Sequence, residues 1–361
     1  MNTERWPKDL STAAGRWAGF GPYYAMFPLG FAKHVIEKYC PLGGAVLDPF
    51  CGRGTAPFVA KALGREAVGV DINPVAWLYT AVKTDPFRTP TIVNMRLSNV
   101  ARAVRKSDKV AETEFQASAW SPSVLGYLNA ARRVLDWRDR SLDRTIMGFI
   151  LVYLHAKKGG GLSNCMRQSK AMAPDYSVRW WRERKLSPPD LDPVAFLKQR
   201  VDWRYKHGVV IGPAVSVYRG DARKVLGKEN SPAGFDLLLT SPPYCDITNY
   251  RYDNWIRLWM LGGPAEPDHR TAERYADRSA YACLLLDVFK SAAQRLSKDA
   301  IVYVRTDARA FTAAATEQAL RSAWPRRKIV IKRNKPKRST QTVLFGDSTT
   351  KPGDIDLIAV P

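Results

Sequence analysis

The sequence predicts an α/β fold in which a Rossmann-like sheet is interrupted by a mostly helical insertion. Two short apolar strands, at residues 45–48 and 67–70, are separated by a glycine-containing loop and a helix, and an acid closes each strand. This order is typical of half of a dinucleotide-binding sheet. The alternation stops near residue 87 and resumes at residue 215, and 361 residues suit one large domain with an insertion or two modest domains.

The first part of the sheet is expected within residues 1–87. A helix over residues 31–39 precedes a Pro-Leu-Gly-Gly turn and the strand at residues 45–48. A second helix, from about residue 55 to 63, leads to the strand at residues 67–70. The pair Asn73-Pro74 then begins a further helix, because Pro is favoured in the first helical turn.

Residues 88–214 form the predicted insertion. Amphipathic helices are expected near residues 123–135 and 142–155. Residues 131–210 contain 17 Lys or Arg against 8 Asp or Glu, with four tryptophans interleaved. This composition suits an inserted recognition region.

Residues 215–361 are expected to complete the sheet. Strands at residues 215–218, 235–239 and 300–304 are accompanied by a helix around residues 281–296. The segments at residues 328–331 and 356–360 are expected to pair as a terminal antiparallel hairpin.

The charge of the chain favours an anionic polymer as partner. Lys and Arg number 56 against 34 acids, for a net charge of +22, which would hold the protein to a phosphate backbone by counterion release. The alternative is a generally basic protein that binds no specific anionic partner. Five cysteines without a CxxC pair indicate neither a disulfide framework nor a zinc site. The N-terminal residues lack the apolar core of a signal peptide, so we expect a cytoplasmic protein. The longest apolar run, residues 146–154, is too short to span a membrane, so we expect it to form a buried helix.

The segment Asp-Pro-Phe-Cys-Gly-Arg-Gly-Thr, at residues 48–55, predicts a cofactor loop. It follows a strand at the edge where open α/β sheets bind ligands, and Gly52 and Gly54 let backbone N–H groups approach a ligand closely. The loop lacks a P-loop lysine, which disfavours phosphate binding. Asp71 closes the second strand and could accept hydrogen bonds from both ribose hydroxyls of an adenosine cofactor.

This segment resembles the DPFCGSGT cofactor segment of DNA amino-methyltransferases, with Arg53 in place of the usual Ser. The resemblance implies a seven-stranded class I methyltransferase sheet, S-adenosylmethionine as cofactor, and a prokaryotic, nucleoid-associated protein. Residues 23–28 are similar to the family's segment that holds the methionine end of the cofactor; the alternative is that these aromatic residues are part of the core. Asp221 corresponds to the family's acidic turn beside the cofactor adenine; the alternative is an ordinary surface turn. The cofactor residues implied are Tyr24, Phe27, Pro28, Asp48, Pro49, Phe50, Cys51, Gly52, Gly54, Thr55, Asp71, Ile72, Asp221 and Ala222.

The run Ser241-Pro242-Pro243-Tyr244 predicts the acceptor site. An exocyclic base amine is a poor nucleophile, so it needs hydrogen-bond acceptors, and the Ser241 hydroxyl and the Pro242 carbonyl can supply them. Pro242 and Pro243 lack N–H groups and stiffen the loop, while Tyr244 can stack on a base extruded from the duplex. The motif resembles that of cytosine-N4 methyltransferases, whereas adenine-N6 enzymes more often carry Asp or Asn first.

The cofactor segment comes first, then the insertion, then the acceptor segment. This order resembles the alpha-type arrangement, in which the insertion reads the target sequence. Duplex DNA is therefore the expected partner, with a restriction endonuclease as a possible second one. A lysine- and glycine-containing loop and the residues after it are candidates for DNA contact, with a solvated loop as the alternative. They are Lys157, Lys158, Ser163, Asn164, Arg167 and Lys170.

Three other functions are considered. Guanine-N2 RNA methyltransferases share a related motif pair, but usually add an RNA-binding domain and carry Asp or Asn before Pro-Pro. A catalytically silent DNA-binding scaffold would not require intact motifs. Cytosine-C5 methylation needs a cysteine nucleophile, and Cys245 is displaced from the expected pattern.

His155 has no ligand partner at suitable spacing, so a structural histidine is expected and no metal.

Overall fold

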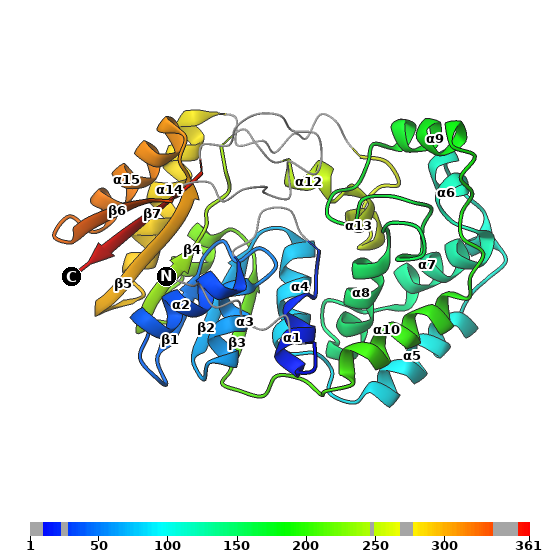
Figure 1. The fold of residues 1–361 in the computed structure, drawn as a ribbon, viewed down its shortest axis with the longest axis horizontal. Coiled ribbons are helices and arrows are strands. Elements are labelled where there is room, and N and C mark those ends of the chain that lie inside the picture. Colours follow the sequence, from blue (N-terminus) through cyan, green and yellow to red (C-terminus); the bar gives the residue numbers. More distant parts are fainter. Residues whose placement is uncertain (1–9, 23–27, 246–248, 268–276, 335–352) are drawn as a thin grey trace.

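The computed structural model describes residues 10–22, 28–245, 249–267, 277–334 and 353–361. These residues contain a seven-stranded sheet in the order β3-β2-β1-β4-β5-β7-β6 (Figure 1). The strands are β1 (Ala45–Asp48), β2 (Glu66–Asp71), β3 (Val215–Arg219), β4 (Phe235–Thr240), β5 (Leu296–Asp307), β6 (Lys328–Asn334) and β7 (Asp354–Val360).

Strands β1 to β5 pair in parallel, and β7 runs antiparallel to both of its neighbours, β5 and β6. The expected terminal hairpin therefore forms, with Ile331 opposite Leu357. Strand β1 lies between β2 and β4, so Val46 faces Ala67 on one side and Leu237 on the other. This arrangement confirms the predicted α/β fold with a seven-stranded sheet.

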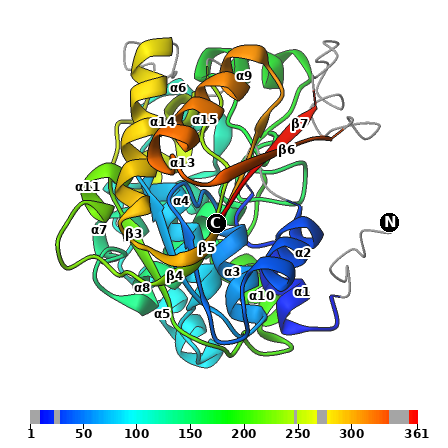
Figure 2. The ribbon, with the colours of Figure 1, turned by 90° about the vertical axis from the view of Figure 1, so that its left-hand side faces the viewer.

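Alternate residues of the central strands face opposite layers of helices, because side chains alternate along a strand. Val46 and Leu237 belong to one buried cluster, and their neighbours Leu47 and Leu238 belong to another. In Figure 2, α2 and α14 lie on opposite sides of the sheet. The first layer holds α1 (Ala13–Ala18), α2 (Leu29–Tyr39), α3 (Thr55–Ala62) and α4 (Pro74–Thr84), and the second holds α11 (Ala222–Leu226), α14 (Arg278–Ala293) and α15 (Ala310–Ala323).

Two helix starts show how local sequence sets these elements. Asn73 caps α4 by accepting a hydrogen bond from the Val75 amide, as the Asn-Pro pair predicts. Helix α14 begins earlier than the expected residue 281, because Asp277 accepts hydrogen bonds from the amides of Ser279 and Ala280. The cap residue, and not the first apolar residue, therefore sets where α14 begins.

The segment between α4 and β3 is helical and gathers on the side of the molecule opposite β6 and β7 (Figure 1). Four of its helices, α5, α7, α9 and α10, carry Pro in the first turn. Its elements are α5 (Pro90–Arg102), η1 (Ser107–Lys109), α6 (Glu114–Ala119), α7 (Pro122–Val134), α8 (Ser141–Tyr153), α9 (Pro174–Glu183) and α10 (Pro193–Tyr205).

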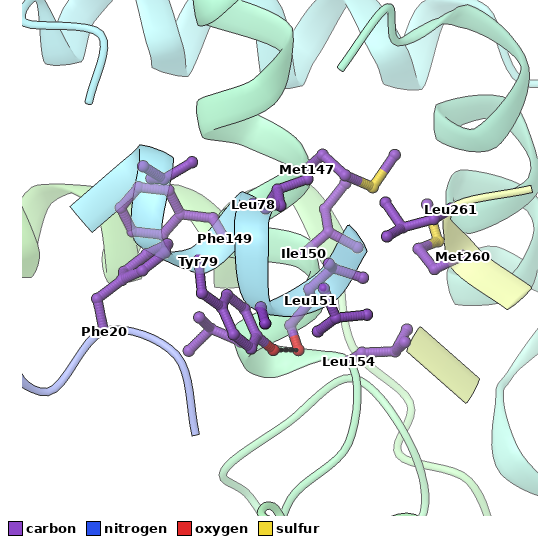
Figure 3. Packing of buried hydrophobic residues seen from close by; sticks show 14 of the residues in the cluster. Phe20, Leu78, Tyr79, Met147, Phe149, Ile150, Leu151, Leu154, Met260 and Leu261 are labelled. Carbon is purple, nitrogen blue, oxygen red and sulfur yellow. Dashed lines mark hydrogen bonds between the residues drawn. The ribbon is translucent and has the colours of Figure 1, made fainter. Parts of the chain in front are cut away.

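The apolar run at residues 146–154 lies mostly in α8 and is buried against the sheet layer. Figure 3 shows Phe149 beside Phe20, and the Tyr79 hydroxyl of α4 donating a 3.1 Å hydrogen bond to the Leu151 carbonyl. Met260 ends α13 (Trp255–Met260), which follows α12 (Tyr250–Asp253), and it packs in the same cluster. One hydrophobic core thus joins the sheet layer, the insertion and the segment after the acceptor motif. Among the described helices, none is long and apolar enough to cross a membrane.

Candidate active site

The two predicted motifs meet at one edge of the sheet, because β1 and β4 are parallel neighbours. Where the strands end, the Thr240 hydroxyl donates a 2.6 Å hydrogen bond to Asp48 Oδ1, across 192 positions of sequence. Both side chains are buried, with 2% of Asp48 and none of Thr240 exposed. This bond fixes the cofactor loop relative to the acceptor motif.

Asp48 supports the loop from below. Its Oδ1 also accepts a hydrogen bond from the Phe50 amide at 3.2 Å. Burial raises the pKa of Asp48 to about 7, although the bonds from Thr240 and Phe50 act in the opposite direction. Asp48 thus holds the loop and the acceptor strand together, and it also lines the smaller of the two cavities described below.

The glycine loop is held between β2 and α4. Asp71 Oδ2 accepts a 2.8 Å hydrogen bond from the Gly52 amide, and the Thr80 hydroxyl donates to the Gly52 carbonyl, also at 2.8 Å. Gly54 has φ +76°, and a Cβ atom there would lie 2.4 Å from Thr80 Cγ2. Only glycine fits this close approach.

Asp71 combines a structural role with free acceptor capacity. Its Oδ1 accepts from the Asn73 amide at 2.8 Å, so each oxygen uses one of its roughly two lone pairs on the backbone. Burial raises the pKa of Asp71 to about 6, against the effect of these two bonds. The carboxyl lines the main cavity, where its remaining lone pairs can accept hydroxyl donors.

Arg53, the departure from the usual motif, bonds to the N-terminal segment. Its Nη1 donates to the Gly21 carbonyl at 3.1 Å, and burial lowers its pKa to about 10. Lys83 Nζ donates to the Arg53 carbonyl at 2.7 Å from a position only 2% exposed. Sequence analysis missed Lys83 and Thr80, although polar residues on the buried face of an apolar helix are a usable signal.

A cavity of about 920 Å³ opens above the strand ends and is shared by both motifs. Ile72, 58% exposed, lies on its wall. The insertion contributes Trp137, which is 5% exposed, with the Arg138 guanidinium stacked 4.3 Å from its ring centroid. The predicted site residues that line this cavity are Pro49, Phe50, Gly52, Asp71, Ile72, Asp221, Ala222, Ser241 and Pro243.

A smaller cavity of about 70 Å³ adjoins the first, and Phe50, Gly52, Ser241 and Tyr250 line both. Burial raises the pKa of Tyr244 to about 12, so its phenol is neutral at physiological pH. The predicted residues that line the smaller cavity are Pro28, Asp48, Phe50, Cys51, Gly52, Thr55, Ser241, Pro242 and Tyr244.

Three predicted cofactor residues are not placed in either cavity. Tyr24 and Phe27 lie outside the described residues. Gly54 lines neither cavity and instead forms the tight turn against Thr80. Asp221, which does line the larger cavity, caps α11 and pairs with Arg223 at 2.6 Å.

The candidate DNA-contact residues divide into two groups. Lys157, Lys158 and Arg167 are exposed, as is Lys170, which pairs with Asp253 at 2.7 Å.

Ser163 and Asn164 are only 4% and 3% exposed, which corrects the expectation that they contact DNA. Asn164 Nδ2 donates to the carbonyls of Ser118 and Leu186, and the Ser163 hydroxyl donates to the Asn164 carbonyl. These bonds tie the loop to the insertion, and neither side chain is available to a groove.

His155 is fully buried, with Nδ1 2.7 Å from the Arg167 carbonyl oxygen. Burial holds its pKa well below the ordinary value. Among the residues with described coordinates, no group of three or more His, Cys, Asp or Glu is placed to hold a metal ion.

Comparison with known proteins supports the resemblance carried by residues 48–55. A family profile described as DNA methylase matches residues 2–80. The type II methyltransferase M.SmaI of Serratia marcescens is 42% identical over 53 residues, 15% of this chain and 18% of that protein. M.ScaI of Streptomyces caespitosus is 36% identical over 73 residues, 20% of this chain and 24% of that protein. The matched stretches thus span less than a quarter of either relative.

Solved structures resemble the chain at lower identity. TrmN from Thermus thermophilus is 11% identical with a TM-score of 0.37, over 98% of this chain and 52% of that chain. The rRNA methyltransferase aviRa from Streptomyces viridochromogenes is 13% identical with a TM-score of 0.35, over 98% of this chain and 92% of that chain.

Proposed function

We propose that the protein transfers a methyl group from S-adenosylmethionine to an exocyclic amine of a DNA base. The observation that carries the proposal is that the cofactor loop and the acceptor motif line one cavity of about 920 Å³. A 2.6 Å hydrogen bond from the Thr240 hydroxyl to Asp48 Oδ1 links the two strands that carry these motifs. Positioning of this kind can contribute roughly 7–11 kcal/mol toward lowering a barrier.

The chain's residues fit an adenosine cofactor. The lone pairs of Asp71 that face the cavity can accept both ribose hydroxyls, and Ile72 and Ala222 offer apolar surface to an adenine ring. The glycine loop leaves room for close approach, because Gly52 carries no side chain. When bound, S-adenosylmethionine supplies an electrophilic methyl group on a sulfonium.

The acceptor motif can prepare an amine without a strong base. The Ser241 hydroxyl and the Pro242 carbonyl are hydrogen-bond acceptors for N–H groups, which favours a pyramidal nitrogen with an available lone pair. Tyr244 stays neutral and offers a ring for stacking on an extruded base. The proton released after transfer passes to water, either directly or by relay through the Ser241 hydroxyl.

Cytosine N4 is the preferred target, because Ser241 occupies the first position of the motif, and adenine N6 is the alternative. The deciding experiment incubates duplex DNA with the protein and S-adenosylmethionine labelled in its methyl group, followed by mass spectrometry of the nucleosides. Label in N4-methylcytosine supports the proposal, and label in N6-methyladenine changes the target base. Label in neither rules out both, and a strong preference for tRNA in a competition arm assigns the activity to RNA.

Duplex DNA as substrate is supported by the charge of +22 and by the exposed residues Lys157, Lys158 and Arg167 of the insertion. We extend the proposal to target recognition by residues 88–214, and to a restriction endonuclease with the same target as a further partner. The log of the DNA affinity falls as the log of the salt concentration rises. Replacing Lys157 and Lys158 by Gln should make this dependence shallower, reducing the magnitude of its slope by about 1.8, since each phosphate contact contributes about 0.9. An unchanged slope would remove this loop from the DNA interface.

A further inference from the structure

Arg305 of β5 enters the smaller cavity beneath the acceptor motif and has no role in the motifs so far described. The cavity, about 70 Å³, places Arg305 together with Ser241, Pro242 and Tyr244 of the acceptor side and Thr55 of the cofactor loop. A guanidinium is planar and presents five N–H donors, which suits it to oxyanions. Its position beside the reacting groups therefore calls for an explanation.

The orientation of Arg305 is fixed by a bidentate pair. Its Nε and Nη2 donate to Asp356 Oδ1 and Oδ2 at 2.6 and 2.8 Å, and its Cζ lies 3.4 Å from the centroid of the Phe31 ring. Asp356 is held in turn by the Tyr303 hydroxyl at 2.9 Å and by Asn334 Nδ2 at 2.8 Å. The side chains of Arg305 and Asp356 are only 13% and 4% exposed, so the guanidinium is preorganised.

This pairing leaves donors available. Among the described residues, the hydrogen bonds of Arg305 are those of Nε and Nη2 to Asp356, so Nη1 has no acceptor there. Nη1 is not one of the buried polar atoms without a partner, so it is open to solvent and can donate to a ligand in the cavity. Arg53, the other arginine of this cavity, differs in that its Nη1 donates to the Gly21 carbonyl while its Nε is buried without a partner.

We propose that Arg305 binds the α-carboxylate at the amino-acid end of the cofactor, an assignment that rests on the proposed function. The larger cavity holds Asp71 for the ribose, and the two cavities adjoin at Phe50, Gly52 and Ser241. A ligand that combines a nucleoside with an amino acid can occupy both at once. The smaller cavity has a volume suited to a carboxylate and its α-carbon, and Asp354 on its wall gives it both signs of charge, as a zwitterion requires.

The experiment compares two ligands that differ in the carboxylate alone, S-adenosylmethionine and its decarboxylated analogue, by calorimetric titration of the full chain. In Arg305→Met we expect binding of S-adenosylmethionine to weaken about 10- to 100-fold, the range for a hydrogen bond to a charged group. Binding of the decarboxylated analogue should change less than about twofold. Arg305→Lys, which keeps the charge without the planar fork, should give an intermediate loss of S-adenosylmethionine binding.

Arg96→Met is the matched control, because Arg96 makes a similar bidentate pair with Asp143, at 2.8 and 3.1 Å, in the insertion. It should leave both affinities unchanged. If Arg305→Met does not fold, the double variant with Asp356→Asn removes the buried unpaired carboxylate and the same comparison is made.

Equal weakening of both ligands in Arg305→Met would overturn the assignment in favour of a structural arginine. Unchanged binding of both ligands with a raised KM for DNA would overturn it in favour of contact with the target base. Failure of the unmodified protein to bind S-adenosylmethionine at all would instead refute the proposed function.

Discussion

Replacing Thr240 by Val tests whether the bond to Asp48 holds the two strand ends together. Valine keeps the shape of the side chain and removes the donor of the 2.6 Å bond. Above pH 8 Asp48 is ionised, because its pKa is about 7, and loss of a hydrogen bond to a charged group costs about 1.5–3 kcal/mol. Below pH 6 the carboxyl is protonated, and the loss falls to about 0.5–1.5 kcal/mol, as for a neutral bond.

The sign follows from proton binding. A carboxyl whose pKa is raised in the folded protein binds more protons there than in the unfolded chain, so the Asp48 contribution to stability decreases as pH rises from about 4 to 7. Removing the Thr240 donor raises the pKa of Asp48 further and extends this decrease to higher pH. The free energy of unfolding lost in Thr240→Val must therefore grow with pH.

Urea unfolding followed by tryptophan fluorescence at pH 5.5 and 8.5 measures this loss. Thr84→Val is the control, because the buried Thr84 hydroxyl donates at 2.8 Å to the Thr80 carbonyl, which does not titrate. Its loss should be equal at the two pH values. A loss in Thr240→Val that is also independent of pH, or larger at pH 5.5, would refute the account of Asp48 as a carboxyl ionised beside its partner.

Three further predictions concern the site. Gly54→Ala should destabilise the protein by about 1–3 kcal/mol and weaken binding of S-adenosylhomocysteine, because its Cβ would lie 2.4 Å from Thr80. Gly64→Ala, with a similar φ of +77° but open space, is its control, and equal cofactor binding in the two variants would contradict the prediction. Ribose hydroxyls should lower the Asp71 pKa from about 6, so S-adenosylhomocysteine binding should weaken up to about tenfold per pH unit below that value, and Asp71→Asn should lose this slope. Tyr244→Ala should abolish turnover while S-adenosylhomocysteine still binds, and normal turnover would remove stacking from the mechanism.

The meeting of residues 48–55 and 241–244 at one end of the sheet could be predicted, because each segment is a continuous motif at the end of an apolar strand. The burial of Ser163 and Asn164 could not be predicted. It depends on hydrogen bonds to the carbonyls of Ser118 and Leu186, and the local sequence pattern does not show that these carbonyls lie beside the loop. Arg305 was missed for the same reason. Its partner Asp356 lies 51 positions later, on a strand whose antiparallel register with β5 only the structure supplies.

The continuous core seen in Figure 3 constrains how such a protein could acquire a new target sequence. Because Tyr79 bonds to the Leu151 carbonyl and Phe20 packs on Phe149, exchanging residues 88–214 as a cassette would strip apolar surface from α4. Retargeting by recombination would then require matched changes on both sides of the junction. If the insertion binds DNA as proposed, substitution of exposed residues such as Lys157 and Arg167 is the easier route to altered DNA contact, since it leaves the shared interior intact.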